Sequence, residues 1–279
     1  MKVWLDGRLR EEERACISPA DHGFLLGDGV FETLRSYDGK PFALAEHLER
    51  LAAAAEMLAI PLPPLDELSR GSADVLEANA IPNARLRITV TSGAGPSGLA
   101  RGAGPATVLI TASPLRPWAE ATTAVVLPWV HDESDPLAGV KTTSRAESVA
   151  ALRRARSMGA EEALFLNRAD NLCEATTANV FVVREGVVQT PPLSAGCLAG
   201  ITRERVLRLC PELGIPSADD DIPGQALGGA EELFLTSSTR EIQALVEVNG
   251  QRVGNGEPGP ITTRLVQAFS NQIRSELEA

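Results

Sequence analysis

Lysine is scarce in this 279-residue chain, which carries 26 basic residues but only three lysines. Lys2 lies at the N-terminus and Lys40 in an Asp-Gly-Lys-Pro turn, so both are expected to be solvated. Lys141 lies in mid-chain, between an apolar segment at 137–140 and a Thr-Thr-Ser run. Arginine cannot lose its proton near neutral pH, whereas a desolvated lysine can, and only a neutral amine forms a Schiff base. Lys141 is therefore a candidate for amine chemistry; the alternative is a surface lysine ahead of a helix.

Other absences narrow the class of protein. No apolar run approaches the roughly 20 residues that a membrane-spanning helix needs, and the first residues are too polar for a signal peptide. The net charge of -11 argues against nucleic acid or an anionic membrane as partner. The four cysteines show no CxxC spacing and the three histidines lie far apart, so we expect no metal site. The two common glycine-rich nucleotide loops are absent. We therefore expect a cytoplasmic protein with small-molecule ligands.

The periodicity of the first half indicates strands combined with amphipathic helices. Alternating apolar and polar residues predict strands at 30–37 and 84–91, and helical spacing predicts helices at 44–60 and 65–80. Residues 18–29 are dense in Gly and Asp, which favours an ordered loop over a helix.

A proline-rich segment, Ser113-Pro-Leu-Arg-Pro-Trp118, predicts a linker, because prolines in a polar context stop both helix and sheet. We therefore divide the chain into an N-terminal α+β domain at 1–112, a linker at 113–121 and a C-terminal domain at 122–279. We expect mixed or antiparallel sheets. The second half is predicted to contain strands at 124–129, 162–166, 179–183, 187–190 and 232–239, a hairpin at 246–253, and helices at 146–158, from 200 onward, and at 261–277.

Three features of the second half suit a phosphorylated cofactor. Gly200-Ile-Thr opens a predicted helix, where free backbone N–H groups bind anions, although an ordinary threonine cap gives the same pattern. The hydroxyl run Thr236-Ser-Ser-Thr239 follows an apolar strand, although Ser/Thr turns are common. Glu174 precedes another apolar strand. A carboxylate at this position could keep a cofactor's ring nitrogen protonated; the alternative is a solvated charge at the edge of the sheet.

With Lys141, these segments resemble class IV pyridoxal-phosphate enzymes, which have fold type IV. The resemblance covers essentially the whole chain and implies an α+β fold, with a smaller N-terminal domain and a larger cofactor-binding domain whose mixed or antiparallel sheet or barrel is flanked by helices. It rests on Lys141, Glu174-Ala-Thr-Thr-Ala-Asn-Val-Phe181, Gly200-Ile-Thr-Arg203, Leu235-Thr-Ser-Ser-Thr-Arg-Glu241, Asp21-His-Gly-Phe-Leu-Leu-Gly-Asp-Gly-Val-Phe-Glu-Thr-Leu-Arg35 and Glu46-His-Leu-Glu-Arg-Leu51.

The resemblance also implies a role for each matching residue. Lys141 forms the Schiff base with pyridoxal 5'-phosphate and then moves the proton of the substrate's Cα, while Glu174 pairs with the pyridine nitrogen. Arg50, Ile201, Thr202 and Ser238 bind the phosphate group. The cofactor-binding set is Arg50, Lys141, Glu174, Asn179, Ile201, Thr202 and Ser238, and the substrate-binding set is Phe31, Thr33, Arg35, Arg87, Thr177 and Thr239.

The family contains branched-chain L-amino-acid, D-amino-acid and R-selective amine aminotransferases, and 4-amino-4-deoxychorismate lyases. Residues 18–35 resemble the lyases and the D-specific enzymes, because Thr33 stands where the branched-chain enzymes usually have Gly. The segment after Lys141 lacks the asparagine usual in the lyases, and Thr91-Ser92 replaces the arginine with which bacterial D-specific enzymes bind the carboxylate. Our candidates for binding the substrate carboxylate are Arg87 and Arg35, and Arg87 is similar to a strand arginine of the branched-chain enzymes. For each of them, the alternative is a surface ion pair.

The resemblance therefore predicts a ping-pong aminotransferase that takes an amino acid and a 2-keto acid, with a D-amino acid favoured and a branched-chain L-amino acid as the other possibility. The alternative is 4-amino-4-deoxychorismate lyase, which makes 4-aminobenzoate and pyruvate. A third reading, a non-catalytic cofactor-binding or interaction protein, requires an exposed Lys141. Family members are homodimers, so we expect a homodimer. From their composition, the loop at 92–105 and the linker are predicted to border the substrate entrance.

Overall fold

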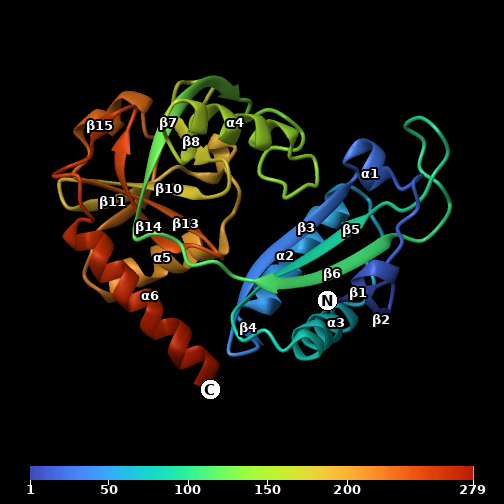
Figure 1. Ribbon diagram of the computed structural model, residues 1–279. Helices are drawn as coiled ribbons and strands as arrows, with labels where there is room; N and C mark the ends of the chain where they lie inside the picture. Colours follow the sequence, from blue (N-terminus) through green and yellow to red (C-terminus); the bar gives the residue numbers. More distant parts are fainter. Residues whose placement is uncertain (279) are drawn as a thin grey trace. The chain divides into compact units, whose positions relative to one another are not determined.

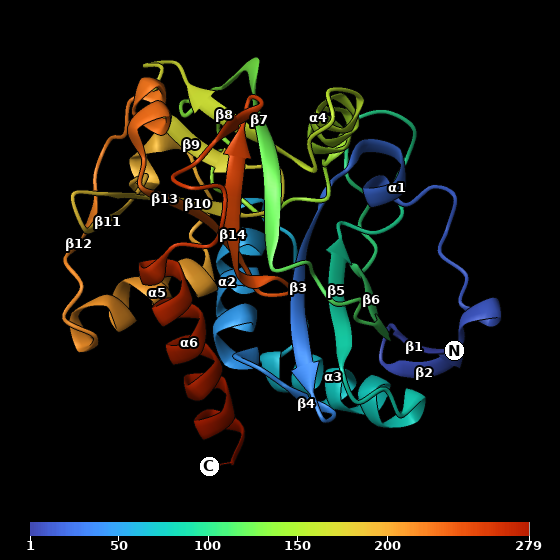
Figure 2. The ribbon, with the colours of Figure 1, turned by 60° about the vertical axis from the view of Figure 1, so that its left-hand side comes forward.

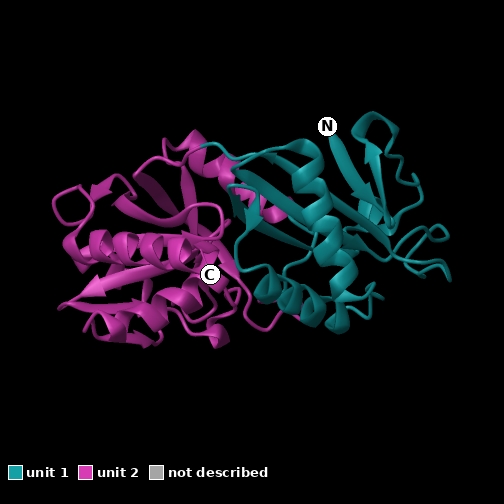
Figure 3. Cartoon of the chain, turned by 90° about the horizontal axis from the view of Figure 1, so that it is seen from below, with its two compact units in different colours: residues 1–116, 140–145 teal, residues 117–139, 146–279 magenta. Residues whose placement is uncertain are grey.

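The computed structural model describes residues 1–278 and divides into two compact units (Figures 1 and 3). Unit 1 contains residues 1–116 together with 140–145, and unit 2 contains residues 117–139 and the chain from 146 onward. Lys141 therefore belongs to unit 1, although it follows the predicted linker in sequence. The domain boundaries drawn at 1–112, 113–121 and 122–279 stay a prediction.

Unit 1 is built on a six-stranded antiparallel sheet with the strand order β2-β1-β6-β5-β3-β4. Asp6 and Gly7 have φ values of 48° and 83°, and both being positive suits the tight Asp-Gly turn that joins the paired strands β1 and β2. β3 pairs with β5 from Gly29↔Thr91 to Arg35↔Arg85. The strands are β1 (Lys2–Leu5), β2 (Arg8–Glu11), β3 (Gly29–Tyr37), β4 (Lys40–Pro41), β5 (Ala84–Thr91) and β6 (Thr107–Pro114).

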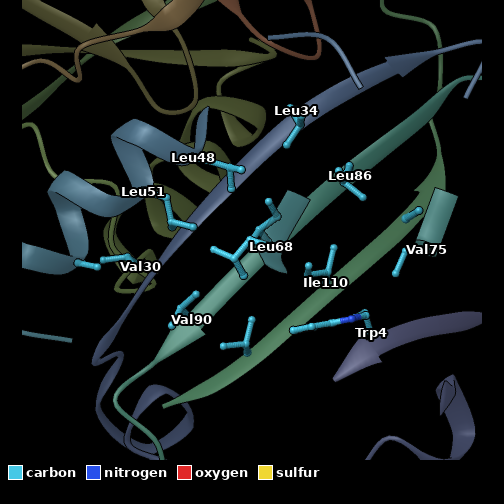
Figure 4. Close-up of a cluster of buried hydrophobic side chains, with 14 of the residues drawn as sticks. Trp4, Val30, Leu34, Leu48, Leu51, Leu68, Val75, Leu86, Val90 and Ile110 are labelled. Carbon is cyan, nitrogen blue, oxygen red and sulfur yellow. The ribbon is translucent and has the colours of Figure 1, made fainter. Parts of the chain in front are cut away.

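The helices α2 (Leu44–Met57) and α3 (Leu65–Asn79) cover the face of this sheet that holds the hydrophobic core. Because side chains alternate along a strand, the even-numbered residues of β3 and β5 point into this core. The odd-numbered residues, which include the predicted substrate-side residues, lie on the opposite face. Figure 4 labels the core residues Trp4, Val30, Leu34, Leu48, Leu51, Leu68, Val75, Leu86, Val90 and Ile110.

Residues 18–29 contain a short helix, α1 (His22–Leu26), so the prediction of a loop without a helix was wrong. The carboxylate of Asp21 caps this helix by accepting a hydrogen bond of 2.8 Å from the backbone N–H of Gly23. Gly27 ends the helix in the left-handed conformation, with φ 71°. The Asp and Gly residues that favoured a loop are therefore the two caps of one short helix.

The expectation that the prolines of the 113–118 segment stop the sheet was wrong for Pro114, because β6 continues to that residue. Pro114 pairs with Ala84 of β5, whose own N–H points away from β6 and donates to the hydroxyl of Ser36. In an antiparallel ladder, the nitrogen of Pro114 then also points away from β5. β1 pairs with β6 only at Leu109 and Ile110, so no N–H is needed at residue 114.

Unit 2 is built on a nine-stranded mixed sheet with the order β12-β11-β10-β13-β14-β7-β8-β9, and β15 pairs with β14. The β14–β7, β7–β8 and β11–β12 pairs are parallel and the others are antiparallel; β14 and β7 run side by side in Figure 2. The strands are β7 (Ala121–His131), β8 (Glu162–Asn167), β9 (Leu172–Ala175), β10 (Asn179–Arg184), β11 (Val187–Thr190), β12 (Ser217–Asp219), β13 (Glu232–Ser237), β14 (Glu241–Val248) and β15 (Gln251–Arg252).

Three long helices flank this second sheet. α4 (Ala146–Ser157) packs on β7 and β8, α5 (Ile201–Glu212) packs on β12 and β13, and α6 (Pro260–Glu278) packs on β13 and β14. The expected α+β class, with mixed and antiparallel sheets flanked by helices, is confirmed. Nowhere in residues 1–278 does a helix combine the length and apolar character needed to cross a membrane. Within residues 1–278 there are also three short 3-10 helices: η1 (Glu12–Arg14), η2 (Leu193–Ala195) and η3 (Gly224–Gly229).

Candidate active site

The backbone around Lys141 is held against β3. The N–H of Phe31 donates to the carbonyl of Lys141 over 3.1 Å, and the N–H of Thr143 donates to the carbonyl of Gly29 over 2.8 Å. Val30 and Thr142 form an antiparallel bridge between these two bonds. The Lys141 segment therefore acts as a short extra strand at the start of β3, which fixes the Cα of Lys141 relative to Phe31.

The ring of Phe31 contacts two cations, Lys141 and Arg87. Nζ of Lys141 lies 4.7 Å and Cζ of Arg87 lies 3.9 Å from the ring centroid. Such cation–π contacts orient a charge without neutralising it. Arg87 also donates to the hydroxyl of Thr89 over 3.0 Å, but no carboxylate within residues 1–278 pairs with Arg87. Burial lowers the pKa of Arg87, and the charges of Arg85 and Arg145 lower it further, so an anion bound there would relieve this repulsion.

Thr33 lies directly opposite Arg87 in the β3–β5 pair, so the two side chains share one face of the sheet. Its hydroxyl is buried and finds no hydrogen-bond partner in the described chain. Buried polar atoms normally have partners, so this hydroxyl suits a polar ligand atom. Arg35, two residues further along β3, stacks over the ring of Tyr37, with its Cζ 4.4 Å from the centroid.

Arg50 is held by a buried carboxylate that the sequence analysis did not single out. Nε and Nη2 of Arg50 donate to Oε1 and Oε2 of Glu32 over 2.7 and 2.8 Å, and Nδ1 of His47 lies 2.7 Å from Oε2. Burial alone would raise the pKa of Glu32, but the hydrogen bonds from His47 and Arg50 outweigh it and lower that pKa to about 2. Glu32 is therefore ionised, and the neutral ring of His47 donates from Nδ1. In the sequence, this cluster is indicated by the three-residue spacing of His47 and Arg50, which puts both side chains on one face of the predicted helix.

In unit 2, Glu174 and Asn179 hold the same residue of a loop. Oε2 of Glu174, on β9, accepts the backbone N–H of Leu198 over 2.9 Å, and Nδ2 of Asn179 donates to the carbonyl of Leu198 over 2.8 Å. A Cβ at Gly200 would collide with Oδ1 of Asn179, so only glycine fits there. Leu198, which positions the Glu174 carboxylate through its backbone, was not singled out in the sequence analysis.

This loop leads into the N-terminus of α5, which is suited to bind an anion. No side chain caps the helix at Gly200, and Ile201 and Thr202 occupy its first turn, where backbone N–H groups lack helical acceptors. Thr236 lies opposite Asn179 on the neighbouring strand, and its buried hydroxyl has no partner in the part of the chain that the structure describes. These donors suit a phosphate group, and the Glu174 carboxylate suits a protonated ring nitrogen, so the residues present fit pyridoxal phosphate.

The predicted site residues fall into two sets, and their individual roles stay predictions. Thr177 donates to Oε2 of Glu162 over 3.2 Å and accepts from Arg240, so its hydroxyl is engaged within the protein. Ser238 and Thr239 lie in the turn between β13 and β14. Unit 1 holds Phe31, Thr33, Arg35, Arg50, Arg87 and Lys141; unit 2 holds Glu174, Thr177, Asn179, Ile201, Thr202, Ser238 and Thr239.

Comparison with known proteins agrees with this geometry. The model of the amino-transferase class IV family matches residues 29–248. The chain is 36% identical to a putative branched-chain-amino-acid aminotransferase of Methanocaldococcus jannaschii, over 97% of this chain and 96% of the relative. It is 32% identical to the D-alanine aminotransferase of Bacillus licheniformis, over 99% and 98% of the two chains. The crystal structure of the Escherichia coli branched-chain amino acid aminotransferase superposes with a TM-score of 0.93 at 30% identity, over 98% of this chain and 94% of the other.

Proposed function

We propose, on the premise that this chain belongs to the class IV aminotransferases, that a D-amino acid is its favoured amino donor. The protein is a pyridoxal-phosphate-dependent transaminase of fold type IV, and it moves amino groups between amino acids and 2-keto acids. When bound, the cofactor supplies an electron sink for the bond broken at the substrate's Cα. Lys141 would move the proton at this Cα, Glu174 would keep the cofactor's ring nitrogen protonated, and Arg50, Ile201, Thr202 and Ser238 would hold its phosphate.

The pair formed by Arg87 and Thr33 supports the amino-acid carboxylate site on which the proposal depends. A half-buried guanidinium without a carboxylate partner in residues 1–278 lies across from a buried hydroxyl without a partner. Together they offer charge-assisted and neutral hydrogen bonds to one substrate carboxylate. Arg87 and Lys141 both contact the ring of Phe31. A substrate whose carboxylate is bound by Arg87 would therefore have its Cα near the amine of Lys141.

Two considerations bear on the handedness of the donor. Residues 18–35, in which Thr33 replaces the glycine usual in the branched-chain enzymes, resemble the D-specific enzymes and the lyases more than the branched-chain enzymes. The curated relatives, however, include a D-alanine aminotransferase and a putative branched-chain aminotransferase at similar identity. Because both relatives span nearly the whole chain, a direct comparison of the two donors is needed.

With purified holoenzyme, we expect D-alanine to convert the bound cofactor into its pyridoxamine form faster than L-leucine does. The spectrum of the cofactor reports this first half-reaction, and pyruvate then restores the original band. Arg87→Met should raise KM for the preferred donor about 10- to 100-fold, because hydrogen bonds to a charged group contribute about 1.5–3 kcal/mol. The matched control is Arg10→Met, at an exposed position of β2, which should leave KM unchanged.

Three results would contradict parts of this proposal. Faster conversion by L-leucine would make the D-specific assignment wrong while leaving the transaminase intact. An unchanged KM in Arg87→Met would place the carboxylate site elsewhere. Release of pyruvate and 4-aminobenzoate from 4-amino-4-deoxychorismate, without transamination, would favour the lyase instead.

We also propose that the protein is a cytoplasmic homodimer. Its four cysteines, all without a disulfide bond, are consistent with a reducing compartment. α1 presents three consecutive apolar side chains to solvent: Phe24, Leu25 and Leu26 are 77%, 52% and 43% exposed. Apolar groups gathered in this way mark interaction surfaces, and a second copy of the chain is the partner that the family implies. Phe24→Asp should therefore yield a monomer in light scattering; an unchanged dimer, or a monomeric wild type, would contradict this.

A further inference from the structure

Arg240 is a buried arginine with partners on several segments of unit 2. It lies at the end of the β13–β14 turn, Ser238–Arg240, and is 7% exposed. Its Nη2 donates to Oε2 of Glu162 over 2.8 Å and to Oγ1 of Thr177 over 3.2 Å. Its Nη1 donates to Oε1 of Gln243 over 3.1 Å. One guanidinium thus connects strand β8, the β9–β10 turn and strand β14.

The partners of Arg240 also bind one another. Thr177 donates to the same Oε2 of Glu162, which is 2% exposed. Gln243 is also buried, and its Nε2 donates to the carbonyl of Ala119 over 2.7 Å. The ring of Trp118 lies against the guanidinium, with Cζ of Arg240 4.4 Å from its centroid. The first residues of unit 2 are thereby tied to the same cluster.

The two turns joined by Arg240 carry predicted site residues. The β9–β10 turn, Thr176–Ala178, contains Thr177 and lies between Glu174 and Asn179. The β13–β14 turn contains Ser238 and Thr239, and the N–H of Arg240 within it donates to the hydroxyl of Ser237 over 3.3 Å. The β9–β10 turn precedes β10 and the β13–β14 turn follows β13, and these two strands pair antiparallel with Asn179 opposite Thr236, so the two turns lie at the same end of adjacent strands. The contact from Nη2 of Arg240 to Thr177 joins them.

We propose that Arg240, through Glu162, Thr177 and Gln243, is a positioning residue that fixes these two turns for substrate binding. This inference rests on the proposed function of the site. An arginine suits the task because its planar, forked donors bind three acceptors at once while its face stacks on an indole. A lysine would keep the charge near Glu162 but would lose the fork and most of the stacking.

A purely structural role for this cluster makes a different prediction. A buried ion pair contributes little net stability, because burying two charges costs about as much as their attraction returns. Burial lowers the pKa of Arg240, and Glu162 opposes that shift, as this balance requires. Replacing both charges by apolar side chains should therefore restore stability, whereas only the native geometry would restore substrate binding.

The test compares Arg240→Met, Arg240→Lys and the double variant Arg240→Met/Glu162→Leu in the holoenzyme. We expect Arg240→Met to raise KM for the amino donor about tenfold, with kcat changed less than threefold, and to lower Tm. The double variant should recover most of the Tm but keep the raised KM. Calorimetric titration of the unreacted holoenzyme with pyruvate should show the same weakening as a raised Kd. Arg240→Lys should fall between wild type and Arg240→Met, and Arg70→Met, 72% exposed on α3, is the matched control.

Two outcomes would overturn the proposal. One is a KM and pyruvate Kd at wild-type values in Arg240→Met. The other is full recovery of both in the double variant together with its Tm, because the cluster would then act only through stability. A wild type that transaminates no amino acid would instead contradict the proposed function, and the two failures are therefore distinguishable.

Discussion

Lys141→Ala is expected to lower transamination by about 10⁴-fold or more while leaving the fold intact. Positioned acid–base catalysis alone contributes about 10²–10⁴-fold, and the same amine is also the predicted covalent attachment point of the cofactor. The segment that carries Lys141 is held to β3 by backbone bonds at Phe31 and Gly29, which a side-chain substitution does not remove. Activity and stability should therefore separate in this variant.

The scarcity of lysine provides a matched set of controls. Lys2→Ala, at an exposed position of β1, should keep wild-type activity. Lys141→Arg should be as inactive as Lys141→Ala, because it keeps the positive charge near Phe31 but cannot act as a neutral amine. Single-turnover measurements with the donor, alongside thermal unfolding, give both quantities. More than a tenth of wild-type activity in Lys141→Ala would refute the assignment of Lys141.

The strands that carry the site were predictable because their periodicity is local. β5 occupies the predicted residues 84–91, and the strand predicted at 30–37 is β3. Alternation along β3 puts Phe31, Thr33 and Arg35 on one face, and Arg87 lies on the same face. The pairing of Lys141 with β3 was not predictable in the same way. It joins segments about 110 residues apart, and no local pattern specifies which strand edge a six-residue segment will meet.

The partners of the buried polar groups also could not be predicted from local sequence patterns. Glu32 alternates into the apolar face of β3, where a carboxylate is expected only if it has partners. Its partners, His47 and Arg50, lie on α2 and become visible only once the helix is packed on the sheet. Likewise, Arg240 could be read as part of a family motif, but its contacts with Glu162 and Thr177 depend on the order of strands in unit 2.

Glu32→Gln is expected to destabilise the protein by about 3–5 kcal/mol at neutral pH, because it leaves the buried groups of His47 and Arg50 without their charged partner. The neutral amide keeps the shape of the side chain but cannot accept from both donors at full strength. Urea unfolding at matched protein and cofactor concentrations measures the difference. Asp66→Asn is the control: the Asp66–Arg70 pair is 74% and 72% exposed, and its loss should leave the midpoint unchanged.

The difference between wild type and Glu32→Gln should also depend on pH in one direction. The pKa of Glu32 falls from 4.5 to about 2 on folding, so its ionisation stabilises the folded state fully above about pH 4.5. As pH falls from 4.5 through about 2, the wild type loses this contribution, whose order of magnitude is about 3 kcal/mol, and the two proteins should converge. Burial lowers the pKa of His47 and Glu32 opposes that shift, so His47 also costs stability as pH falls below 6.5. This cost is larger in Glu32→Gln than in the wild type until Glu32 itself is protonated in the wild type. A difference that stayed constant down to pH 3 would show that the loss in Glu32→Gln comes from packing and not from the ionised carboxylate.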